Sequence, residues 1–466
     1  TGASTSMDVD AFHQSLWRCD LDAAAALLDS VHSQESGSPD YLKHRADLLH
    51  RASDFAAALE LYLELGKVHP SYLWHRYPLV DACAHLGLGS LAVSELQSMV
   101  ERSTLPAGVA NQIFAEGWMP LGMDAEIQSL DRNHSHGPSD QQMLLMMQGQ
   151  SRMRSAGIAA GLPDYRAGYC VPDAWRMSYP QMAHELPSYW YGQHELPRQL
   201  VVQGRGGMGD YLQWLRYVPL LEAMGVTVQY GQALPGLQCL PVEDDRGVRA
   251  LHEYGYYLGG AGTSLWTDPF TLFAALFPVV GYAAAPRYLA LTHPKRTALL
   301  QAQVRRQAGG KPCVGLFWSA NESPGPFGGR SLTLQHLSAL LEMEDVHWVI
   351  FQRGCQRERW LRDERCTDAA RYTTVPASMS YGDSIGFASQ LDALVCIDSG
   401  LLHACAALAT PCVLVGNVAT EWRWESGART GWYPTVSIVR APRLGAWGEA
   451  VDEVGRTLGR LLEGVP

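Results

Sequence analysis

Apolar residues recur at helical spacing through the first third of the chain, from Asp8 to about Arg154. Alternation of β-branched residues is almost absent there, so the pattern predicts helices rather than strands. The segment also matches itself at a fixed period, because Ala24, Ala58 and Ala92 lie 34 residues apart. The companion positions that keep this register are Leu28, Tyr62 and Leu96, and Val31, Leu65 and Met99. The first third is therefore expected to be a helical repeat.

The period of 34 resembles the tetratricopeptide repeat, in which a small residue lets two antiparallel helices approach closely. The Trp and Gly positions of the first helix are poorly matched, so the repeats are expected to be degenerate. Further helices are predicted at 106–118, 120–130 and 139–156, and the repeat region is placed at residues 1–157. A helical solenoid offers a concave surface suited to a protein partner. The alternative is a scaffold that packs on the rest of the chain and forms a homo-oligomer.

The pattern changes after the repeats. Residues 161–198 are rich in Pro, Tyr and Trp with little periodicity, which is typical of an irregular connector. Strands are then predicted at 200–203 and 226–230, with a helix at 211–224 between them. Short strands alternating with helices indicate a parallel sheet with ligands at its carboxyl edge, so residues 158–300 are assigned to a first Rossmann-like domain.

The same alternation starts again at residue 311 and defines a second Rossmann-like domain over residues 301–466. Strands are predicted at 311–318, 347–352 and 394–397, and helices at 331–341, 383–390 and 444–462. The fold class is therefore α/β with an N-terminal all-α repeat region.

A glycine-rich loop follows the first strand, with Gly206, Gly207 and Gly209 before Asp210 at the expected helix start. Together with Gly204, these glycines fit the dinucleotide pattern Gly-x-Gly-x-x-Gly. The next strand ends without the Asp or Glu that would bind a ribose hydroxyl, which disfavours a dinucleotide. Asp210 has two interpretations that the local sequence leaves open: a base for an attacking hydroxyl, or an N-cap of the helix.

A second candidate site lies where the strand at 394–397 runs into Asp398, Ser399 and Gly400. Backbone N–H groups at such a helix start are suited to a phosphate. His403, one turn further on, is placed to reach the same ligand. Its alternative interpretation is a buried histidine bonded to backbone.

Two arginines, Arg330 and Arg353, follow predicted strands at the same edge of the sheet. Isolated arginines are usually surface charges, but beside a helix start they form a plausible diphosphate site. The loop at 420–425 is aromatic and charged, which suits stacking on a sugar or base, or a packed corner.

Composition limits the classes of partner and the compartment that are expected for the chain. The net charge is −11 and no Lys/Arg-rich run is present, so nucleic acid is not expected. No apolar stretch approaches the roughly 18–20 residues of a membrane span, and residues 1–10 lack the pattern of a secretion signal. The simplest compartment is the cytoplasm. The ten cysteines contain no Cys-x-x-Cys pair, so free, reduced thiols are expected.

Several short motifs occur in one order along the chain. They are Trp190-Tyr-Gly192, Gly209-Asp210, Val314-Gly-Leu-Phe-Trp318, Arg330-Ser331, Gln352-Arg-Gly354, Asp383, Asp398-Ser-Gly-x-x-His403, Trp422-Arg-Trp424 and Trp432-Tyr-Pro434. With the repeats in front, this set resembles the bacterial tetratricopeptide-containing glycosyltransferases whose catalytic half is similar to the lipopolysaccharide heptosyltransferases. The resemblance covers about residues 187–440. The glycine loop departs from the relatives by an extra glycine and by Arg205.

The resemblance implies a GT-B fold, in which two Rossmann-like domains face a cleft and the last helix crosses back to the first domain. It implies that Asp210 is the general base of an inverting, metal-independent displacement. No cofactor is expected, because the nucleotide-sugar is a co-substrate. The donor-binding residues that it implies are Trp318, Asn321, Arg330, Arg353, Asp398, Ser399, Gly400 and His403, with Trp318 and Asn321 at the pocket rim.

The leading hypothesis from these features is a glycosyltransferase that moves a sugar from a nucleotide-sugar to a protein, such as flagellin or another surface protein, held by the repeats. A second hypothesis is a heptosyltransferase-like enzyme that acts on a glycan or a lipid-linked acceptor. A third is a non-catalytic repeat scaffold with a vestigial nucleotide-binding fold.

Overall fold

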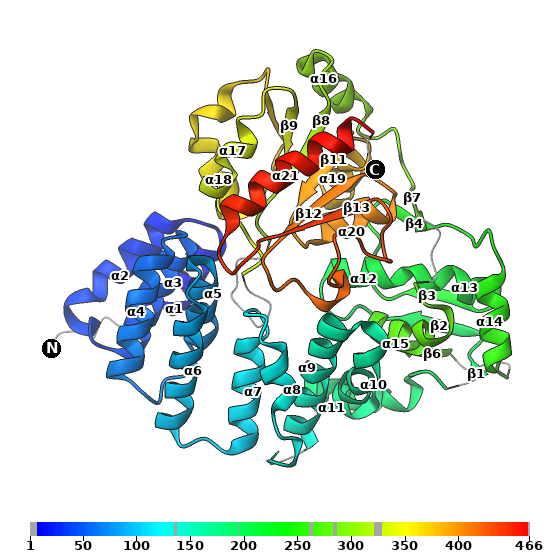
Figure 1. Cartoon of the computed structure of the whole chain (residues 1–466), viewed down its shortest axis with the longest axis horizontal. Coiled ribbons are helices and arrows are strands. Elements are labelled where there is room, and N and C mark those ends of the chain that lie inside the picture. Colours follow the sequence, from blue (N-terminus) through cyan, green and yellow to red (C-terminus); the bar gives the residue numbers. More distant parts are fainter. Residues whose placement is uncertain are drawn as a thin grey trace.

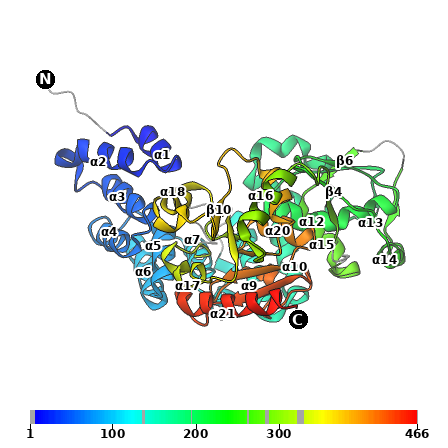
Figure 2. The ribbon, with the colours of Figure 1, turned by 90° about the horizontal axis from the view of Figure 1, so that it is seen from above.

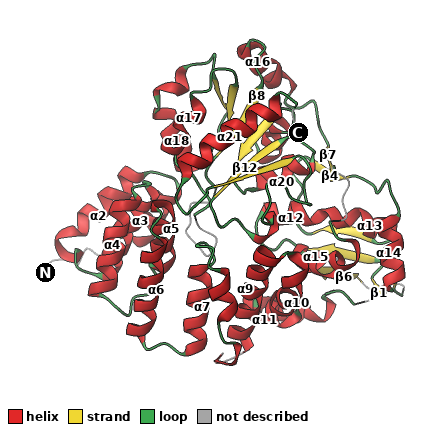
Figure 3. Ribbon diagram, in the orientation of Figure 1, coloured by secondary structure: helices red, strands yellow, loops and turns green. Residues whose placement is uncertain are grey.

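The chain forms three parts, a helical region and two α/β units (Figure 1). The arrangement comes from a computed structural model, which describes residues 7–134, 138–193, 195–260, 264–282, 287–320 and 329–464. The first helices, α1 to α6, lie at the opposite end of the molecule from the first α/β unit (Figure 2), while the later helix α10 packs against α15 of that unit. In the described ranges, strands occur only in the two α/β units (Figure 3).

The N-terminal helices confirm the 34-residue period. Ala24, Ala58 and Ala92 lie in the second helices of three successive pairs, and all three are fully buried. Two of these second helices begin alike, because the side chains of Asp20 and Asp54 cap them by accepting from the N–H three residues on. The elements of this region are α1 (Val9–Trp17), α2 (Leu21–Glu35), α3 (Pro39–Arg51), α4 (Phe55–Val68), α5 (Arg76–Leu86), α6 (Gly89–Ser103), α7 (Ala107–Trp118), α8 (Asp124–Ser129), η1 (Arg132–His134), α9 (Pro138–Ala156), α10 (Ile158–Tyr169), α11 (Pro172–Ser178) and η2 (Pro180–Ser188).

The irregular connector expected at 161–198 was wrong, because most of α10 and all of α11 and η2 lie in it. Helix α10 packs tightly on α9. A methyl group at Gly149 or Gly161 would collide with the backbone of the other helix, so these glycines let the two backbones touch. Close packing of α10 on α9 therefore outweighs the poor helix signal of the Pro-rich sequence.

The first α/β unit contains a parallel sheet in the order β3-β2-β6, as the alternating pattern predicted. The single helix expected at 211–224 is divided into α12, η3 and α13, because Pro219 has no N–H for an i→i−4 bond. The elements of this unit are β1 (Glu195–Leu196), β2 (Gln199–Val202), α12 (Met208–Trp214), η3 (Leu215–Tyr217), α13 (Val218–Ala223), β3 (Thr227–Tyr230), β4 (Leu237–Cys239), α14 (Arg246–Tyr254), β5 (Tyr257–Leu258), β6 (Ser264–Thr267), α15 (Pro269–Val280) and β7 (Leu289–Leu291).

The second α/β unit is built on a six-stranded parallel sheet in the order β10-β9-β8-β11-β12-β13. Its central strands are buried throughout, which is typical of a sheet covered on both faces. The elements are α16 (Ala298–Ala308), β8 (Cys313–Phe317), η4 (Gln335–Leu337), α17 (Ser338–Leu341), β9 (His347–Ile350), α18 (Gly354–Arg362), η5 (Glu364–Thr367), β10 (Tyr372–Thr374), α19 (Tyr381–Ala388), β11 (Ala393–Cys396), α20 (Gly400–Ala407), β12 (Cys412–Gly416), η6 (Trp422–Trp424), β13 (Val436–Arg440) and α21 (Trp447–Leu462).

The last helix does not cross back to the first α/β unit as expected. Helix α21 packs on β11, β12 and β13 of its own sheet (Figure 1). Its buried side chains form one stripe at helical spacing and belong to the core of the second unit. That stripe consists of Trp447, Ala450, Val451, Val454 and Leu458. Two α/β units, each with a parallel sheet and both facing a common cavity, otherwise form the GT-B arrangement.

None of the helices in the described ranges is both long and apolar enough to cross a lipid bilayer.

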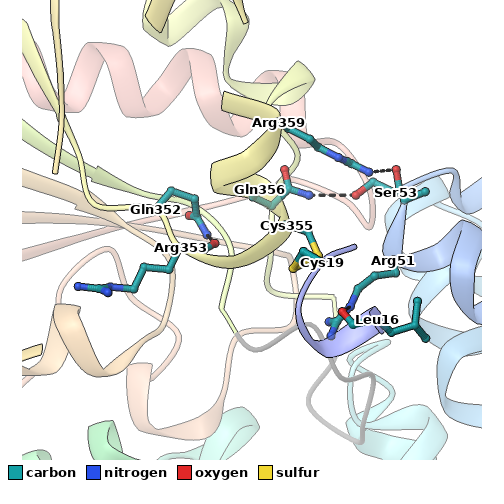
Figure 4. Close-up of a disulfide and its surroundings, with 10 residues drawn as sticks. Leu16, Cys19, Arg51, Ser53, Gln352, Arg353, Cys355, Gln356 and Arg359 are labelled. Carbon is teal, nitrogen blue, oxygen red and sulfur yellow. Dashed lines mark hydrogen bonds between the residues drawn. A yellow bond between two sulfur atoms is a disulfide. The ribbon is translucent and has the colours of Figure 1, made fainter. Parts of the chain in front are cut away.

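A disulfide ties the helical region to the second α/β unit (Figure 4). It joins Cys19, just after α1, to Cys355 in the first turn of α18. The expectation that all cysteines are free was therefore wrong for this pair, while the other eight are free. The two cysteines are 336 residues apart in sequence, so no local spacing could reveal their pairing.

The disulfide predicts the number of free thiols in the protein. Alkylation of the denatured, unreduced protein should label eight thiols, because ten cysteines include one bonded pair. Intact mass spectrometry gives the number directly. Cys19→Ser is the control, since it leaves Cys355 without its partner and should give nine labels. Ten labels on the unreduced wild-type protein would contradict the bond.

Candidate functional site

A cavity of about 750 Å³ lies where the three parts meet. Its walls come from the carboxyl ends of strands in both α/β units, where ligands bind in parallel sheets. The loop after β2 brings Gly206, Gly207, Gly209 and Asp210, all of which line the cavity. The loop after β11 brings Asp398, Ser399, Gly400 and His403. The glycine-rich loop and the Asp398–His403 helix start, both predicted as candidate sites, therefore face one cavity.

Helix α12 and helix α20 meet at their N-termini, and glycine makes this contact close. A Cβ on Gly209 would lie 2.7 Å from Cδ2 of His403 and 3.3 Å from Cα of Gly400. Nearby, Gly206 has φ of +77°, a conformation that glycine adopts without strain. The glycine loop and the start of α12 thus bring the two α/β units into contact.

The contacts of Asp210 bear on the two roles that the sequence left open. Its Oδ2 accepts a hydrogen bond of 2.7 Å from the N–H of Gly207. Gly207 is the N-cap of α12 and Asp210 is the third residue of the helix, so the N-cap position expected for Asp210 was wrong, although its side chain does tie down the helix start. Its Oδ1 lies 2.5 Å from Nη1 of Arg423, and the side chain is 19% exposed. Each carboxylate oxygen keeps a lone pair for a further donor. The bond to Gly207 and a role as acceptor of a proton are compatible.

Arg423 is a buried cation between the two α/β units. It pairs with Asp210 of the first unit and, at 2.6 Å, with Glu421 of the second, and it donates to the amide oxygen of Gln213. Burial would lower the pKa of Arg423, but the carboxylates of Asp210, Glu421 and Asp398 raise it well above its ordinary value. The guanidinium is therefore permanently charged.

The pKa values of Glu421 and its neighbour Asp398 are shifted in opposite directions. Burial raises the pKa of Glu421 and the nearby Asp398 and Asp210 add to this, although Arg423 opposes it. Burial would also raise the pKa of Asp398, but the hydrogen bond from His403 and the charges of Arg423 and Arg330 lower it well below its usual range. Asp398 is therefore ionised at neutral pH.

His403 is buried at 2% exposure, with a side-chain partner for each ring nitrogen. Nδ1 lies 2.9 Å from the hydroxyl of Tyr433, and Nε2 lies 3.2 Å from Oδ1 of Asp398. Burial lowers the pKa of His403, so the ring is neutral and donates from Nε2 to the carboxylate. The alternative of a histidine bonded to backbone was wrong, and the ring holds Asp398 in place.

The start of α20 offers an anion site. Ser399 caps the helix by accepting from the N–H of Leu402. The N–H groups of Gly400 and Leu401 have no acceptor within the helix, and both residues line the cavity. The helix dipole favours negative charge at the same place.

The two candidate arginines differ in how many hydrogen bonds already hold their side chains. Arg353 lines the cavity, but its guanidinium donates to the carbonyls of Ala377 and Met379 and to the hydroxyl of Ser384. Arg330 also lines the cavity, and no hydrogen bond or ion pair holds its side chain within the described residues. Arg330 is therefore the better placed of the two to pair with a ligand.

Three predicted or unusual residues lie elsewhere. The side chain of Trp318 is buried in the core of the second unit and does not line the cavity, unlike the next residue, Ser319. Asn321 lies outside the described residues. Arg205, the extra arginine of the glycine loop, is buried against the ring of Tyr169 and pairs with Asp268 at 3.4 Å. It supports the loop from behind.

Sequence reasoning missed Glu421 and Arg423 as parts of the site. Their loop was expected to stack on a ligand or to form a packed corner, and Trp422 and Trp424 are indeed buried. The charged residues between these aromatics were the available signal. The helical region was also not expected to line the cavity, yet Trp17, Arg51, Met146 and Gln150 do so.

Within the described part of the chain, no group of three His, Cys, Asp or Glu side chains is arranged to hold a metal ion.

Comparisons with known proteins find similarity to solved structures but not to family models or curated sequences. No family model matches the sequence, and no curated protein matches it significantly. Among solved structures, the chain is similar to a mutant of the O-GlcNAc transferase of Thermobaculum terrenum, at 12% identity and a TM-score of 0.33. The match covers 98% of this chain and 91% of that one.

The close contact between the two loops predicts a cost for any side chain at Gly209. Gly209→Ala should lower the free energy of unfolding by about 1–3 kcal/mol, because the new methyl must displace His403 or the backbone at Gly400. Thermal unfolding measures this. The matched control is Gly448→Ala in α21, where a Cβ meets nothing within 4 Å and the substitution should be neutral or slightly stabilising. Equal melting temperatures for the two variants would contradict the contact.

The ionised Asp398 predicts a pH-dependent stability. The folded pKa of Asp398 lies below the unfolded value of about 3.9, so its contribution to stability is fully present above that pH and is lost progressively as the pH falls from there through the folded pKa. Asp398→Asn should destabilise the protein by about 1.5–3 kcal/mol at pH 7, and the difference from wild type should shrink towards pH 3. Melting curves across this range test it. The control is Asp173→Asn, which removes an exposed ion pair and should change the stability little at any pH. If the stability difference between Asp398→Asn and wild type stays constant across this pH range, the ionised state assigned to Asp398 is contradicted.

Proposed function

We propose that the chain is a glycosyltransferase that moves a sugar from a nucleotide-sugar to a protein acceptor. The observation that carries the proposal is the placement of Asp210 opposite the Asp398–His403 helix start across one cavity. A carboxylate faces an anion site there, at a distance set by the contact between Gly209 and Gly400. This is the arrangement that a displacement at an anomeric carbon requires.

On the donor side, the diphosphate would lie at the start of α20. The N–H groups of Gly400 and Leu401 and the guanidinium of Arg330 all line that part of the cavity. As the bond from the anomeric carbon to the phosphate oxygen breaks, negative charge grows on the diphosphate. Fixed donors and a nearby cation stabilise this charge without having to reorganise.

On the acceptor side, Asp210 would accept the proton of the attacking hydroxyl. The hydroxyl oxygen forms the new bond to the anomeric carbon while its proton passes to the carboxylate. Arg423 and the N–H of Gly207 fix the orientation of Asp210 and leave lone pairs free. Attack from the face opposite the leaving diphosphate inverts the anomeric centre.

The helical region supports a protein acceptor, because it forms part of the cavity wall. Trp17 is 72% exposed, and Arg51, Met146 and Gln150 line the same opening. A polypeptide bound along the repeats would therefore reach Asp210 without crossing another part of the chain.

The base role of Asp210 is tested by Asp210→Asn. The amide oxygen of asparagine can still accept the bond from the Gly207 N–H, so α12 should remain intact, but asparagine cannot take up the proton. We expect kcat to fall by about 10²–10⁴-fold while the Kd for the donor changes little. The donor is first identified by a mass-spectrometric screen of nucleotide-sugars, and turnover is then measured with it.

The matched control is Asp54→Asn, at the N-cap of α4 and outside the cavity. It should leave kcat unchanged. Near wild-type turnover for Asp210→Asn would remove Asp210 from the base role. No binding of the wild-type protein to any nucleoside diphosphate in calorimetry would instead favour a non-catalytic scaffold.

A further inference from the structure

A buried polar cluster joins the helical region to the second α/β unit, away from the catalytic carboxylates. It consists of His50 on α3 and Asp81 and His85 on α5, all at most 9% exposed. The mechanism above uses none of them. Burying a carboxylate and two imidazoles is costly unless each finds a partner, so their contacts indicate what the cluster holds.

Asp81 is bonded on both carboxylate oxygens. Its Oδ2 lies 2.8 Å from Nε2 of His50, and its Oδ1 accepts a hydrogen bond from the backbone N–H of Gly329. Burial would raise the pKa of Asp81, but His85, His50 and the Gly329 N–H lower it to about 2. Asp81 is therefore a charged acceptor at neutral pH, and such hydrogen bonds are among the stronger ones in proteins.

His85 holds the other side of the same segment. Its Nε2 lies 3.0 Å from the carbonyl oxygen of Ser331, and its Nδ1 lies 2.9 Å from the carbonyl oxygen of Asp81. A carbonyl oxygen only accepts, so the bond to Ser331 is one that Nε2–H of His85 donates. The ring of Phe55 stacks on His85 at 4.0 Å and restricts its tilt.

Between these two anchors lies Arg330, the arginine that lines the cavity with no described partner. The backbone on either side of it is fixed by α5: Gly329 through its N–H and Ser331 through its C=O. Asn417 adds a bond of 3.2 Å to the carbonyl of Gly329. The backbone that carries the guanidinium is thus held by the helical region through Asp81 and His85, and by the second α/β unit through Asn417 and the bond from the Ala320 N–H to Ser331 Oγ.

We propose that Asp81 and His85 are positioning residues for Arg330, so that the helical repeats build part of the diphosphate-binding site as well as offering a surface to an acceptor. The proposal rests on the function proposed above, because it takes Arg330 as a ligand-binding side chain. It assigns the repeats a role at the donor: without them, the cation that neutralises the leaving group would not be held in place.

The test measures the affinity of the full-length protein for the diphosphates of uridine, guanosine, adenosine, cytidine and thymidine by calorimetry. For the diphosphate that binds, Asp81→Ala should raise Kd about tenfold. In the background of Arg330→Ala, the same substitution should have almost no effect, because no guanidinium remains to be positioned. Such non-additivity is not expected of a change that only destabilises the fold.

Two further variants keep the test decisive if Asp81→Ala does not fold. His85→Leu should weaken binding in the same coupled manner, and His85→Gln should restore much of it, since an amide N–H can still donate to the carbonyl of Ser331. The control is Asp47→Ala on α3, which loses its bonds to Tyr62 and Lys43 but touches nothing near Arg330. It should leave Kd unchanged.

The outcomes separate the two proposals. Coupled loss of affinity in the Asp81 and His85 variants, with Asp47→Ala unaffected, supports positioning. If the wild type binds a diphosphate and these variants bind it equally well, or lose affinity equally with and without Arg330, the positioning role is overturned while the proposed function stands. If the wild type binds none of the five, both fall together.

Discussion

The buried guanidinium of Arg423 is the interaction on which the site depends. It comes from the second α/β unit and pairs with Asp210 of the first, so it links the two halves at the point where chemistry is proposed. A charge this deep is stable only with several partners, and Asp210, Glu421 and Gln213 provide them. Removing either carboxylate would leave the charge of Arg423 less compensated and would change the electrostatic environment of the other. The two halves and their electrostatics are therefore coupled.

Around this pair, glycine and the helical region determine how near the parts come. The contact of Gly209 with Gly400 sets the width between the facing helix starts. On the other side, a disulfide at Cys355 and the hydrogen bond between Gln356 and Ser53 fasten α18 to the repeats (Figure 4). Because α18 follows directly on Arg353, both arginine-bearing edges of the cavity are braced by helices that are distant in sequence.

Local patterns in the sequence were sufficient for the repeats, both parallel sheets and the two loops that meet at the cavity. They failed where the deciding contact is distant. The pairing of Cys19 with Cys355, the burial of Trp318 and the packing of α21 on its own sheet all depend on partners that periodicity cannot reveal. Arg423 was overlooked for the same reason, because a charged residue between tryptophans resembles a surface corner until Asp210 is placed beside it.

Among the described residues, three carboxylates face the cavity, and their surroundings favour Asp210 as the base. Asp398 accepts from His403 and lies near two guanidinium groups, which lower its pKa, so it is a weak proton acceptor. Glu421 has a raised pKa, but it follows the second sheet, on the donor side, and its carboxylate is held by Arg423. Asp210 projects from the opposite loop, and its oxygens have lone pairs to spare. In the proposed function, a hydroxyl that approaches from the helical region would meet this carboxylate across from the anion site, as an inverting displacement would need.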